Sequence, residues 1–397
     1  MRTTQEKIQP LSWVEIDLRA IARNLKELRR LAARNETRGP SDGRWKRMEI
    51  LAVIKADAYG HGSREVGLLL EARGVGFFGV SDIAEGISLR EAGIKKPMLL
   101  LEAALPSLAP YILDYDLIPT VNSLALASSF NRYARRVRKR MRIHIKVDTG
   151  MGRLGVWHEE AFEFIKRVNQ FKHLTIHGLY THFPSADTDK GFTRQQLDIF
   201  YALIQRLDQE GLVISYIHAA NSMGLAGYQT RVLNLARPGL MLYGLHPAPE
   251  VRNDVRLQPA MSVKSRIIYL KKVKKGRSIS YGRTFIAGRD MTVATLPLGY
   301  NDGYLRGFSG KASVLVEGIR CPVIGRVTMD QIMVDVSKVV LSGSRTKHSL
   351  RLGLPVTILG SQKDQTISAD ELARHGETIN YEIVCLLGNR LPRVYKK

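Results

Sequence analysis

The stretch RIHIKVDTGMGRLGVWHEEAFEFIKRVNQFKHLTIHGLYTH, residues 142–182, contains the repeating unit that decides the fold. It opens with an apolar run (142–148), passes a glycine-rich turn, and reaches EEAFEFIKRVNQF (159–171), whose apolar residues recur at helical spacing. A second apolar run (174–182) follows directly. This order of strand, helix and strand predicts neighbours in a parallel sheet.

The same unit recurs on both sides of this stretch, from about residue 48 to residue 245. The apolar runs that we expect to be strands are 49–55, 76–81, 97–102, 117–122, 142–148, 174–182, 214–221 and 232–239. Eight strands that alternate with helices favour closure into a (β/α)8 barrel. An open doubly wound sheet is the alternative, but its phosphate fingerprint G-x-G-x-x-G is absent after the first strand.

The character of the sequence changes after about residue 250. Short β-type runs such as MTVATLPLGY and ASVLVEGIRCPVIGRV are separated by Gly, Asp and Lys turns, which predicts a mostly-β second domain. We therefore expect an α/β chain with a barrel over residues 12–250 and a β-rich domain over 251–397. Residues 1–20 could pack against the second domain, and LSGSRTKHSLRLG (341–353) is typical of a surface loop.

Composition and charge limit the classes of protein that fit. The 397 residues are 44% hydrophobic and 24% charged, which is typical of a globular protein. The net charge of +23 raises the possibility of a nucleic-acid partner, but the basic clusters at 132–140 and 271–275 lack the interleaved aromatics or glycines of such a surface. Basic side chains on solvent-exposed faces explain these two clusters more simply, so we expect no nucleic-acid partner.

The cellular setting that the sequence predicts is the cytoplasm. Cys321 and Cys385 offer neither a disulfide framework nor a metal-binding spacing, so we expect a reducing compartment and no metal. The first residues lack an apolar signal segment, and no apolar run reaches the ~18 residues of a membrane span.

Polar side chains follow several of the expected barrel strands, at the end where (β/α)8 barrels carry their function. They are Lys55, Lys146 with Asp148, His182, Asn221 with Ser222, and Arg237 with Gly239. An isolated lysine at a strand end would ordinarily extend its ammonium into solvent. The alternative is a desolvated lysine that forms a Schiff base, and the small residues around Lys55 leave room for a flat ligand.

The seventh and eighth strands supply a second feature, a potential phosphate site. AANSMG and ARPGLMLYG bring the Ser222 hydroxyl and the backbone N–H of Gly239 to the loops where such barrels commonly bind phosphate. Alone, an Asn-Ser pair and a glycine would usually be an ordinary turn. Together with a lysine at the first strand, they describe a site for pyridoxal phosphate.

The segment AVIKADAYGHG around Lys55 resembles the cofactor-lysine signature of the alanine racemase family. Further blocks are similar to that family in the same order: KVDTGMGRLG, THF, HAANS, RPGLMLYG, SYGRTF, LGYNDGYLR, GRVTMDQ and NYEIVC. The resemblance covers essentially the whole chain. It implies a barrel followed by a β-rich domain, pyridoxal 5′-phosphate as cofactor, and a homodimer with shared active sites that interconverts L- and D-alanine for peptidoglycan synthesis.

The resemblance also implies a role for each matching residue. Lys55 would hold the cofactor covalently, and Arg237 would face its pyridine nitrogen. The cofactor-binding residues that the resemblance implies are Lys55, Tyr59, Arg153, His182, Asn221, Ser222, Arg237, Gly239, Leu240 and Tyr381. Arg153 and Met329 would bind the substrate, and Tyr300, Arg306 and Asp330 would line its access corridor. Lys146 matches a lysine that is often N-carboxylated in the family and pairs with the arginine.

Racemisation needs one base on each face of the α-carbon, and the resemblance gives these roles to Lys55 and Tyr281. A tyrosine is a poor base at neutral pH unless neighbouring groups stabilise its phenolate, and His182 is a candidate neighbour. Position 328 is Thr where many relatives carry Cys, which bears on selectivity.

Other functions remain as alternatives. A racemase for serine or other small amino acids would share both bases. A barrel-type decarboxylase or aldolase would share Lys55 but has no use for Tyr281, and a non-catalytic cofactor carrier would be a barrel alone.

Overall fold

The computed structural model describes residues 9–38, 45–230, 232–251, 254–341, 350–388 and 390–397. Residues 1–8 and most of the expected surface loop, residues 342–349, lie outside this description. The chain divides into two compact units. One is Ala20–Gln258, and the other combines Pro259–Lys397 with Met1–Arg19.

The first unit is built around eight parallel strands, joined in the order β11-β10-β8-β7-β6-β5-β4-β12. In chain order they are β4 (Glu49–Val53), β5 (Phe77–Val80), β6 (Met98–Ala103), β7 (Ile118–Val121), β8 (Met141–Asp148), β10 (Leu174–Tyr180), β11 (Tyr216–His218) and β12 (Leu235–Ala236). Each lies within or overlaps an apolar run that was expected to be a strand, because a strand buried on both faces is apolar along its length.

The two ends of this sheet, β11 and β12, meet and nearly close the barrel. The Asn234 N–H donates to the Ile217 carbonyl at 3.0 Å, and the Arg237 N–H donates to the Ala220 carbonyl at 2.8 Å. On its other side β12 pairs with β4. The predicted (β/α)8 barrel is therefore confirmed, with irregular hydrogen bonds at this one seam.

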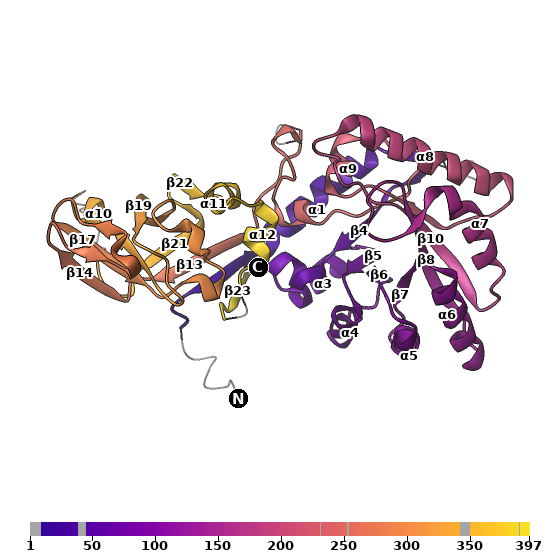
Figure 1. The fold of residues 1–397 in the computed structure, drawn as a ribbon, viewed down its shortest axis with the longest axis horizontal. Coiled ribbons are helices and arrows are strands. Elements are labelled where there is room, and N and C mark those ends of the chain that lie inside the picture. The colour runs from indigo at the N-terminus through magenta and orange to yellow at the C-terminus, as the bar shows by residue number, and fades with distance from the viewer. Residues whose placement is uncertain (1–8, 39–44, 231, 252–253, 342–349, 389) are drawn as a thin grey trace. The chain divides into compact units, whose positions relative to one another are not determined.

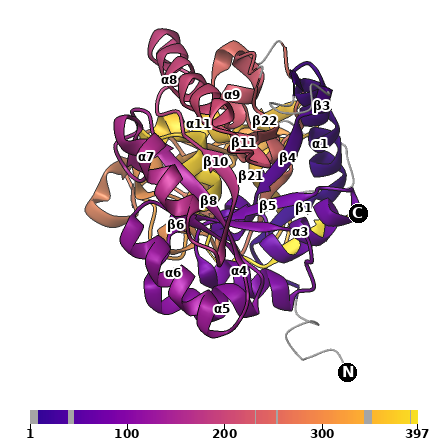
Figure 2. The same cartoon turned by 90° about the vertical axis from the view of Figure 1, so that its right-hand side faces the viewer.

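Helices surround the strands, as Figures 1 and 2 show for α3 to α8. They are α3 (Ser63–Ala72), α4 (Ile83–Glu91), α5 (Ala109–Asp114), α6 (Leu124–Arg136), α7 (His158–Asn169), α8 (Lys190–Gln209) and α9 (Ser222–Gly227). The helix α1 (Leu18–Ala33) lies beside the segment that follows β12, where the Asn24 amide donates to the carbonyls of Leu242 and Gln258. Two short pairings complete the unit, β2 (Glu36–Arg38) with β3 (Trp45–Arg47), and β9 (Val156–Trp157) beside β8.

The barrel interior has an apolar part and a polar part. Leu51, Phe77, Leu99 and Ile118 belong to one buried cluster. On β8 the two-residue period of a strand places Arg142, His144, Lys146 and Asp148 on one face. The His144 ring contacts Phe77 on β5 and His218 on β11, which are not neighbours of β8 in the sheet, so this face points into the barrel. Polar residues inside a barrel need partners, and these partners form the site described below.

The second unit is a mostly-β sheet with the order β14-β17-β20-β19-β18-β21-β13-β1-β23. Its longer strands are β13 (Met261–Arg266), β14 (Tyr269–Val273), β17 (Met291–Leu296), β18 (Ser313–Val316), β19 (Ile319–Ile324), β20 (Ile332–Asp335), β21 (Pro355–Gln362) and β23 (Arg393–Lys396). Shorter strands are β15 (Ser278–Ile279), β16 (Phe285–Ile286) and β22 (Gln365–Ile367), and the helices are α10 (Ser337–Leu341), α11 (Ala369–Gly376) and α12 (Asn380–Cys385). The predicted mostly-β second domain is confirmed.

The N-terminal strand β1 (Trp13–Asp17) belongs to the sheet of the second unit. It pairs antiparallel with β13 and parallel with β23. The β-rich unit therefore includes this N-terminal strand, which lies within the residues 1–20 that could pack against it, and the chain re-enters the unit at Pro259. Across the described ranges, no helix is long and apolar enough to cross a membrane.

Candidate active site

The chain after β4 makes a left-handed turn that begins at Lys55. Ala56, Asp57, Ala58 and Tyr59 have φ values of 52°, 50°, 55° and 53°, so four successive non-glycine residues adopt the left-handed helical conformation. Each such residue costs about 1–2 kcal/mol relative to the right-handed form. Strain of this kind persists only where the surrounding structure imposes it, and it gathers at functional sites.

Hydrogen bonds to two carboxylates hold this turn. Glu85, at the start of α4, accepts from the Ala56 N–H at 2.6 Å and from the Ser81 N–H at 2.7 Å. Asp57 accepts from the Ser63 N–H at 2.7 Å, which ties the turn to α3. The half-buried Lys55 is thereby fixed at the C-terminal end of the first barrel strand.

We predict that Glu85→Ala destabilises the turn and, with it, the placement of Lys55. The change removes the acceptor of two backbone N–H groups, which should lower the free energy of unfolding by about 1–3 kcal/mol. Urea unfolding measures the loss. Glu91→Ala, at the exposed end of the same helix, is the control and should be nearly neutral. Equal stability of the two variants would contradict this account.

Three predicted phosphate-binding groups meet at the seam between the seventh and eighth strands. The Gly239 N–H donates to the Ser222 hydroxyl at 3.1 Å, and the Tyr59 hydroxyl lies against Gly239 so closely that a Cβ there would overlap it. Leu240 begins the short helical turn Leu240–Tyr243, whose first N–H groups have no partner within the turn. A hydroxyl, a phenol and backbone N–H groups form a cup suited to an anion.

Asn221 makes a different kind of contact from the other residues that were predicted to bind the cofactor. Its side-chain oxygen accepts from the Gly224 N–H at 2.9 Å and so caps α9. This cap fixes the backbone at Ser222, the first residue of the helix. The structure therefore gives Asn221 a contact that orients the cup.

Arg237 is a buried cation whose guanidinium contacts groups on several strand ends. Its guanidinium donates to the Thr181 carbonyl at 2.8 Å and the Ala219 carbonyl at 3.0 Å, and it contacts Nδ1 of His218 at 2.7 Å and Nδ1 of His182 at 3.2 Å. Burial lowers the pKa of Arg237 to about 10, so the group remains a cation at neutral pH. With no acceptor of its own, it can only donate.

Positive charge accumulates around this arginine. Burial first, and then the charges of Arg153 and Arg237, lower the pKa of Lys146 to about 8. The pKa of His182 lies well below its usual range because of burial and the nearby cations, which include Lys55, so its ring is neutral at pH 7. The predicted residues Lys55, Lys146, Arg153, His182 and Arg237 are thus close enough to influence one another, in a region that favours anions.

The exposed Arg153 follows a loop that Asp148 organises. The buried Asp148 carboxylate accepts from the N–H groups of Gly150, Met151 and Gly152 at 2.8–2.9 Å. Both glycines have positive φ values, 136° and 68°, which the loop requires. Asp148 was a strand-end candidate for chemistry, and its contacts are those of a loop-forming residue.

Tyr281 lies in the second unit on the turn Tyr281–Arg283, and 71% of its surface is exposed in the single chain. The backbone beside it is constrained, because Ser280, Gly282 and Arg283 all have positive φ. The Ser280 hydroxyl donates to the Arg326 carbonyl at 2.7 Å. Tyr281 is thus an exposed aromatic on a backbone-constrained turn.

Tyr300, predicted to line the access corridor, and Met329, predicted to bind the substrate, lie on two loops of the same unit that hydrogen-bond to each other. The N–H groups of Tyr300 and Asn301 donate to the carbonyls of Thr328 and Met329 at 3.0 and 3.1 Å. Met329 is 52% exposed, and Asp330 forms an ion pair with Arg390 at 2.7 Å. The Thr328 hydroxyl donates to the Gln331 carbonyl and accepts its N–H, which closes the turn that carries Met329.

Two further predicted residues of this unit lie on short helical elements. Arg306 is exposed at the start of Arg306–Phe308, a turn linked to the same loop because the Val327 N–H donates to the Ser309 hydroxyl. Tyr381 lies on α12 and is half-buried.

Sequence reasoning did not single out the residues that support these groups. Glu85 accepts a hydrogen bond from the left-handed turn. The buried His218 contacts Arg237, and the buried His144 contacts His218. The sequence does contain a signal for these residues, because each of the apolar strands β8, β10 and β11 contains a histidine.

Fold and site together define a class of enzyme: a (β/α)8 barrel with a lysine at the end of its first strand and an anion cup after its last two, joined to a β-rich unit. Known proteins identify the family. Residues 16–247 match the alanine racemase N-terminal domain and residues 260–395 the alanine racemase C-terminal domain. An alanine racemase from Halothermothrix orenii is 41% identical over 392 residues, which cover 98% of each chain.

Solved structures agree. The structure of an alanine racemase from Clostridium difficile 630 has a TM-score of 0.87 and 34% identity, covering 98% of this chain and 97% of its own. That of an alanine racemase from Bartonella henselae, with covalently bound pyridoxal phosphate, has a TM-score of 0.81 and 26% identity, covering 98% of this chain and 100% of its own. This chain belongs to the alanine racemase family, which is dependent on pyridoxal phosphate.

Proposed function

We propose that this chain interconverts L-alanine and D-alanine with pyridoxal 5′-phosphate held in the barrel, and that the D-alanine supplies peptidoglycan synthesis in the cytoplasm. The observation that carries the proposal is the meeting of Lys55, Tyr59, Ser222, Arg237 and Gly239 at one end of the barrel, where the surrounding charge is positive.

The cup fits the phosphate of this cofactor. Ser222, Tyr59 and the Gly239 and Leu240 backbone provide hydrogen-bond donors for an anion, and a Cβ at Gly239 would fill the space beside Tyr59. Lys55 would hold the cofactor through Nζ, with Tyr381 as a further phosphate contact. Arg237 would face the ring nitrogen, and because it only donates, that nitrogen would stay unprotonated.

Two residues would move the α-proton. Pyridoxal phosphate, when bound, withdraws electrons from the substrate's α-carbon and makes its proton acidic. The Lys55 amine would then act on one face of that carbon, and the hydroxyl of Tyr281 on the other. We propose that this tyrosine is Tyr281 of the partner subunit in a homodimer, which its exposure in the single chain supports.

The remaining predicted residues would orient the substrate. Arg153 and the Met329 N–H would bind its carboxylate, while Tyr300, Arg306 and Asp330 would line the corridor by which it arrives. Tyr300 and Met329, which are exposed in the single chain, would narrow this corridor and so favour a small side chain such as that of alanine.

The direct test is incubation of the cofactor-loaded protein with each enantiomer of alanine in D2O, followed by chiral separation and mass analysis. We expect both enantiomers to converge on equal amounts and to carry deuterium at the α-carbon. The same measurement with serine tests the alternative substrate, for which we expect a lower kcat/KM. Bound cofactor without inversion of alanine would refute the proposal.

We also propose that Lys146 reacts with carbon dioxide to form a carbamate that pairs with Arg153. Only the neutral amine attacks carbon dioxide, and a pKa of about 8 provides that amine near neutral pH. The reaction joins the Nζ nitrogen to the carbon and releases one proton. The product is an anion among cations, which this region favours.

A carbon-13 NMR signal from labelled bicarbonate should therefore appear at the lysine carbamate and grow between pH 7 and pH 9, since the amine fraction rises through a pKa of about 8. Lys146→Arg should remove the signal. Removal of carbon dioxide should lower kcat/KM by about fivefold, because the ion pair between the carbamate and the exposed Arg153 is lost. A missing signal at pH 9 would eliminate the carbamate.

A further inference from the structure

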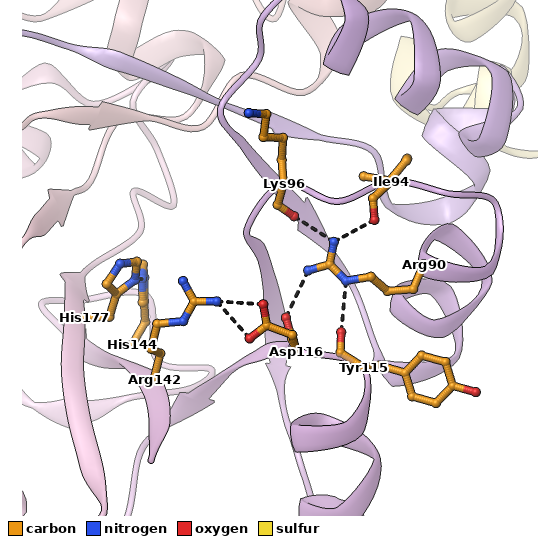
Figure 3. A network of polar contacts seen from close by, with 8 residues as sticks. All are labelled: Arg90, Ile94, Lys96, Tyr115, Asp116, Arg142, His144 and His177. Carbon is orange, nitrogen blue, oxygen red and sulfur yellow. Dashed lines mark hydrogen bonds and ion pairs between the residues drawn. The ribbon is translucent and has the colours of Figure 1, made fainter. Parts of the chain in front are cut away.

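Three histidines join Arg237 to the opposite end of the barrel. Arg237 contacts Nδ1 of His218 at 2.7 Å, Nε2 of His218 contacts Nδ1 of His144 at 2.9 Å, and Nε2 of His144 contacts Nδ1 of His177 at 3.2 Å. His218 and His144 are fully buried, whereas His177 is half-buried. Figure 3 shows the outer end of this chain, where His144 and His177 lie beside Arg142.

The arginine fixes the direction of every hydrogen bond in this chain. A guanidinium only donates, so Nδ1 of His218 must accept and the proton of His218 must be on Nε2. That N–H donates to His144, whose proton is then also on Nε2, and the same reasoning applies to His177. The chain is therefore a one-way series of donors that begins at Arg237 and ends at His177.

The strand β10 positions the histidines of this chain. A β-bulge in β10 between Ile176 and Gly178 adds a residue to the strand and changes where His177 points. A Cβ at Gly178 would overlap the His144 ring, so glycine is required there. The Tyr180 ring stacks on His218 at 4.8 Å with an interplanar angle of 2°. Its hydroxyl contacts that of Thr120 at 2.7 Å.

The groups that face His177 keep it neutral and able to accept. They are Arg142 and His144 on β8, Asp116 before β7, and Tyr216 on β11, whose ring packs against His177 at 4.9 Å. Burial and the charge of Arg142 lower the pKa of His177 to about 4, although Asp116 opposes this. Asp116 is occupied by an ion pair with Arg142 at 2.8 Å, and Arg90 donates to its carbonyl (Figure 3).

We propose that His177 is a positioning residue for Arg237, which acts through His144 and His218 by supplying the acceptor that ends the chain. Without that acceptor, the His144 N–H is buried and unsatisfied, which favours displacement of the His144 ring from its contact with His218. His218 then loses the acceptor for its own N–H and is no longer held in place, so Arg237, which donates to His218, loses its orientation. The effect on catalysis rests on the proposed function, whereas the tautomers do not.

Nitrogen-15 NMR of the histidine-labelled full chain, with and without pyridoxal phosphate, tests the direction of the chain. We expect His218, His144 and His177 all to be protonated on Nε2 between pH 6 and pH 8. A wild-type His218 or His144 protonated on Nδ1 would overturn the proposal. This result does not depend on enzymatic activity, so it is separable from a failure of the proposed function.

Two variants of similar size distinguish the loss of the hydrogen-bond acceptor at position 177 from a change in side-chain volume. In His177→Asn the amide oxygen takes about the place of Nδ1, whereas His177→Leu has no acceptor. We expect His177→Leu to shift the nitrogen-15 signals of His144 and His218 and to lower kcat by at least about fivefold with a smaller change in KM. His177→Asn should retain the Nε2–H tautomers and recover most of that loss.

The matched control is His173→Leu, a nearby histidine outside the chain that contacts the Lys139 carbonyl at 3.1 Å. It should leave kcat and the tautomers unchanged. Equal kcat values for His177→Leu and His177→Asn, or wild-type nitrogen-15 signals of His144 and His218 in folded His177→Leu, would overturn the positioning role. If His177→Leu does not fold, His177→Val, which also lacks an acceptor and suits a strand, takes its place in the same comparison.

Discussion

Replacing Lys55 with alanine should lower kcat by at least about 10⁴-fold and abolish cofactor retention. The reason is that one amine is assigned two tasks, to hold the cofactor covalently and to move the α-proton on one face. The first loss is measured by absorbance after dialysis and the second by chiral analysis of alanine. Lys55→Arg should fail equally, because a guanidinium stays protonated and cannot form the covalent bond.

The matched control for this prediction is Lys95→Ala, an exposed lysine in the same unit. It should retain activity and cofactor. Urea unfolding of Lys55→Ala should resemble that of the wild type, since the left-handed turn is held by Glu85 and Asp57 and not by the lysine itself. Substantial racemisation by Lys55→Ala would show that another group holds the cofactor.

The barrel was predictable because its strands carry a local signal. A strand buried on both faces is apolar along its length, and each of the eight runs of this kind became a strand. The end of each strand was equally visible, which is why Lys55 and Ser222 could be chosen as candidates, whereas the role of Arg237 came from the family resemblance. In a parallel barrel the ends of distant strands necessarily meet.

The partner of β1 was not predictable from its own residues. WVEID alternates between half-buried and buried positions, which indicates a strand, but alternation says nothing about which sheet it joins. Its neighbours, β13 and β23, lie more than 240 residues away in the sequence. Only the completed sheet of the second unit decides this pairing.

The left-handed turn after Lys55 was also invisible in the sequence. Four residues of ADAY adopt a conformation that glycine or asparagine normally occupies, and none of them is either. The turn exists because Glu85, 29 residues away, accepts its first N–H. Non-local contacts that impose local strain cannot be derived from local preferences.

Tyr281→Phe should impair proton removal from L-alanine by about 10²–10⁴-fold while sparing proton removal from D-alanine. The hydroxyl is the proposed base on one face only, and the Lys55 amine on the other face is untouched. In D2O, D-alanine should still acquire deuterium at the α-carbon but should not invert, and L-alanine should do neither. Tyr269→Phe, another exposed tyrosine of the second unit, is the control and should behave as wild type. Equal loss of exchange from both enantiomers would refute the assignment.

The same variant tests whether the two bases come from different subunits. A chain with Lys55→Ala keeps its tyrosine, and a chain with Tyr281→Phe keeps its lysine, so each homodimer lacks a base in both sites. If each site combines Lys55 with Tyr281 of the partner subunit, a mixed dimer contains one intact site and one that lacks both bases. Random exchange of equal amounts makes about half of the dimers mixed, so refolded mixtures should recover about one quarter of wild-type activity. Recovery cannot occur if both bases belong to one chain, because no mixed dimer would then contain a complete site.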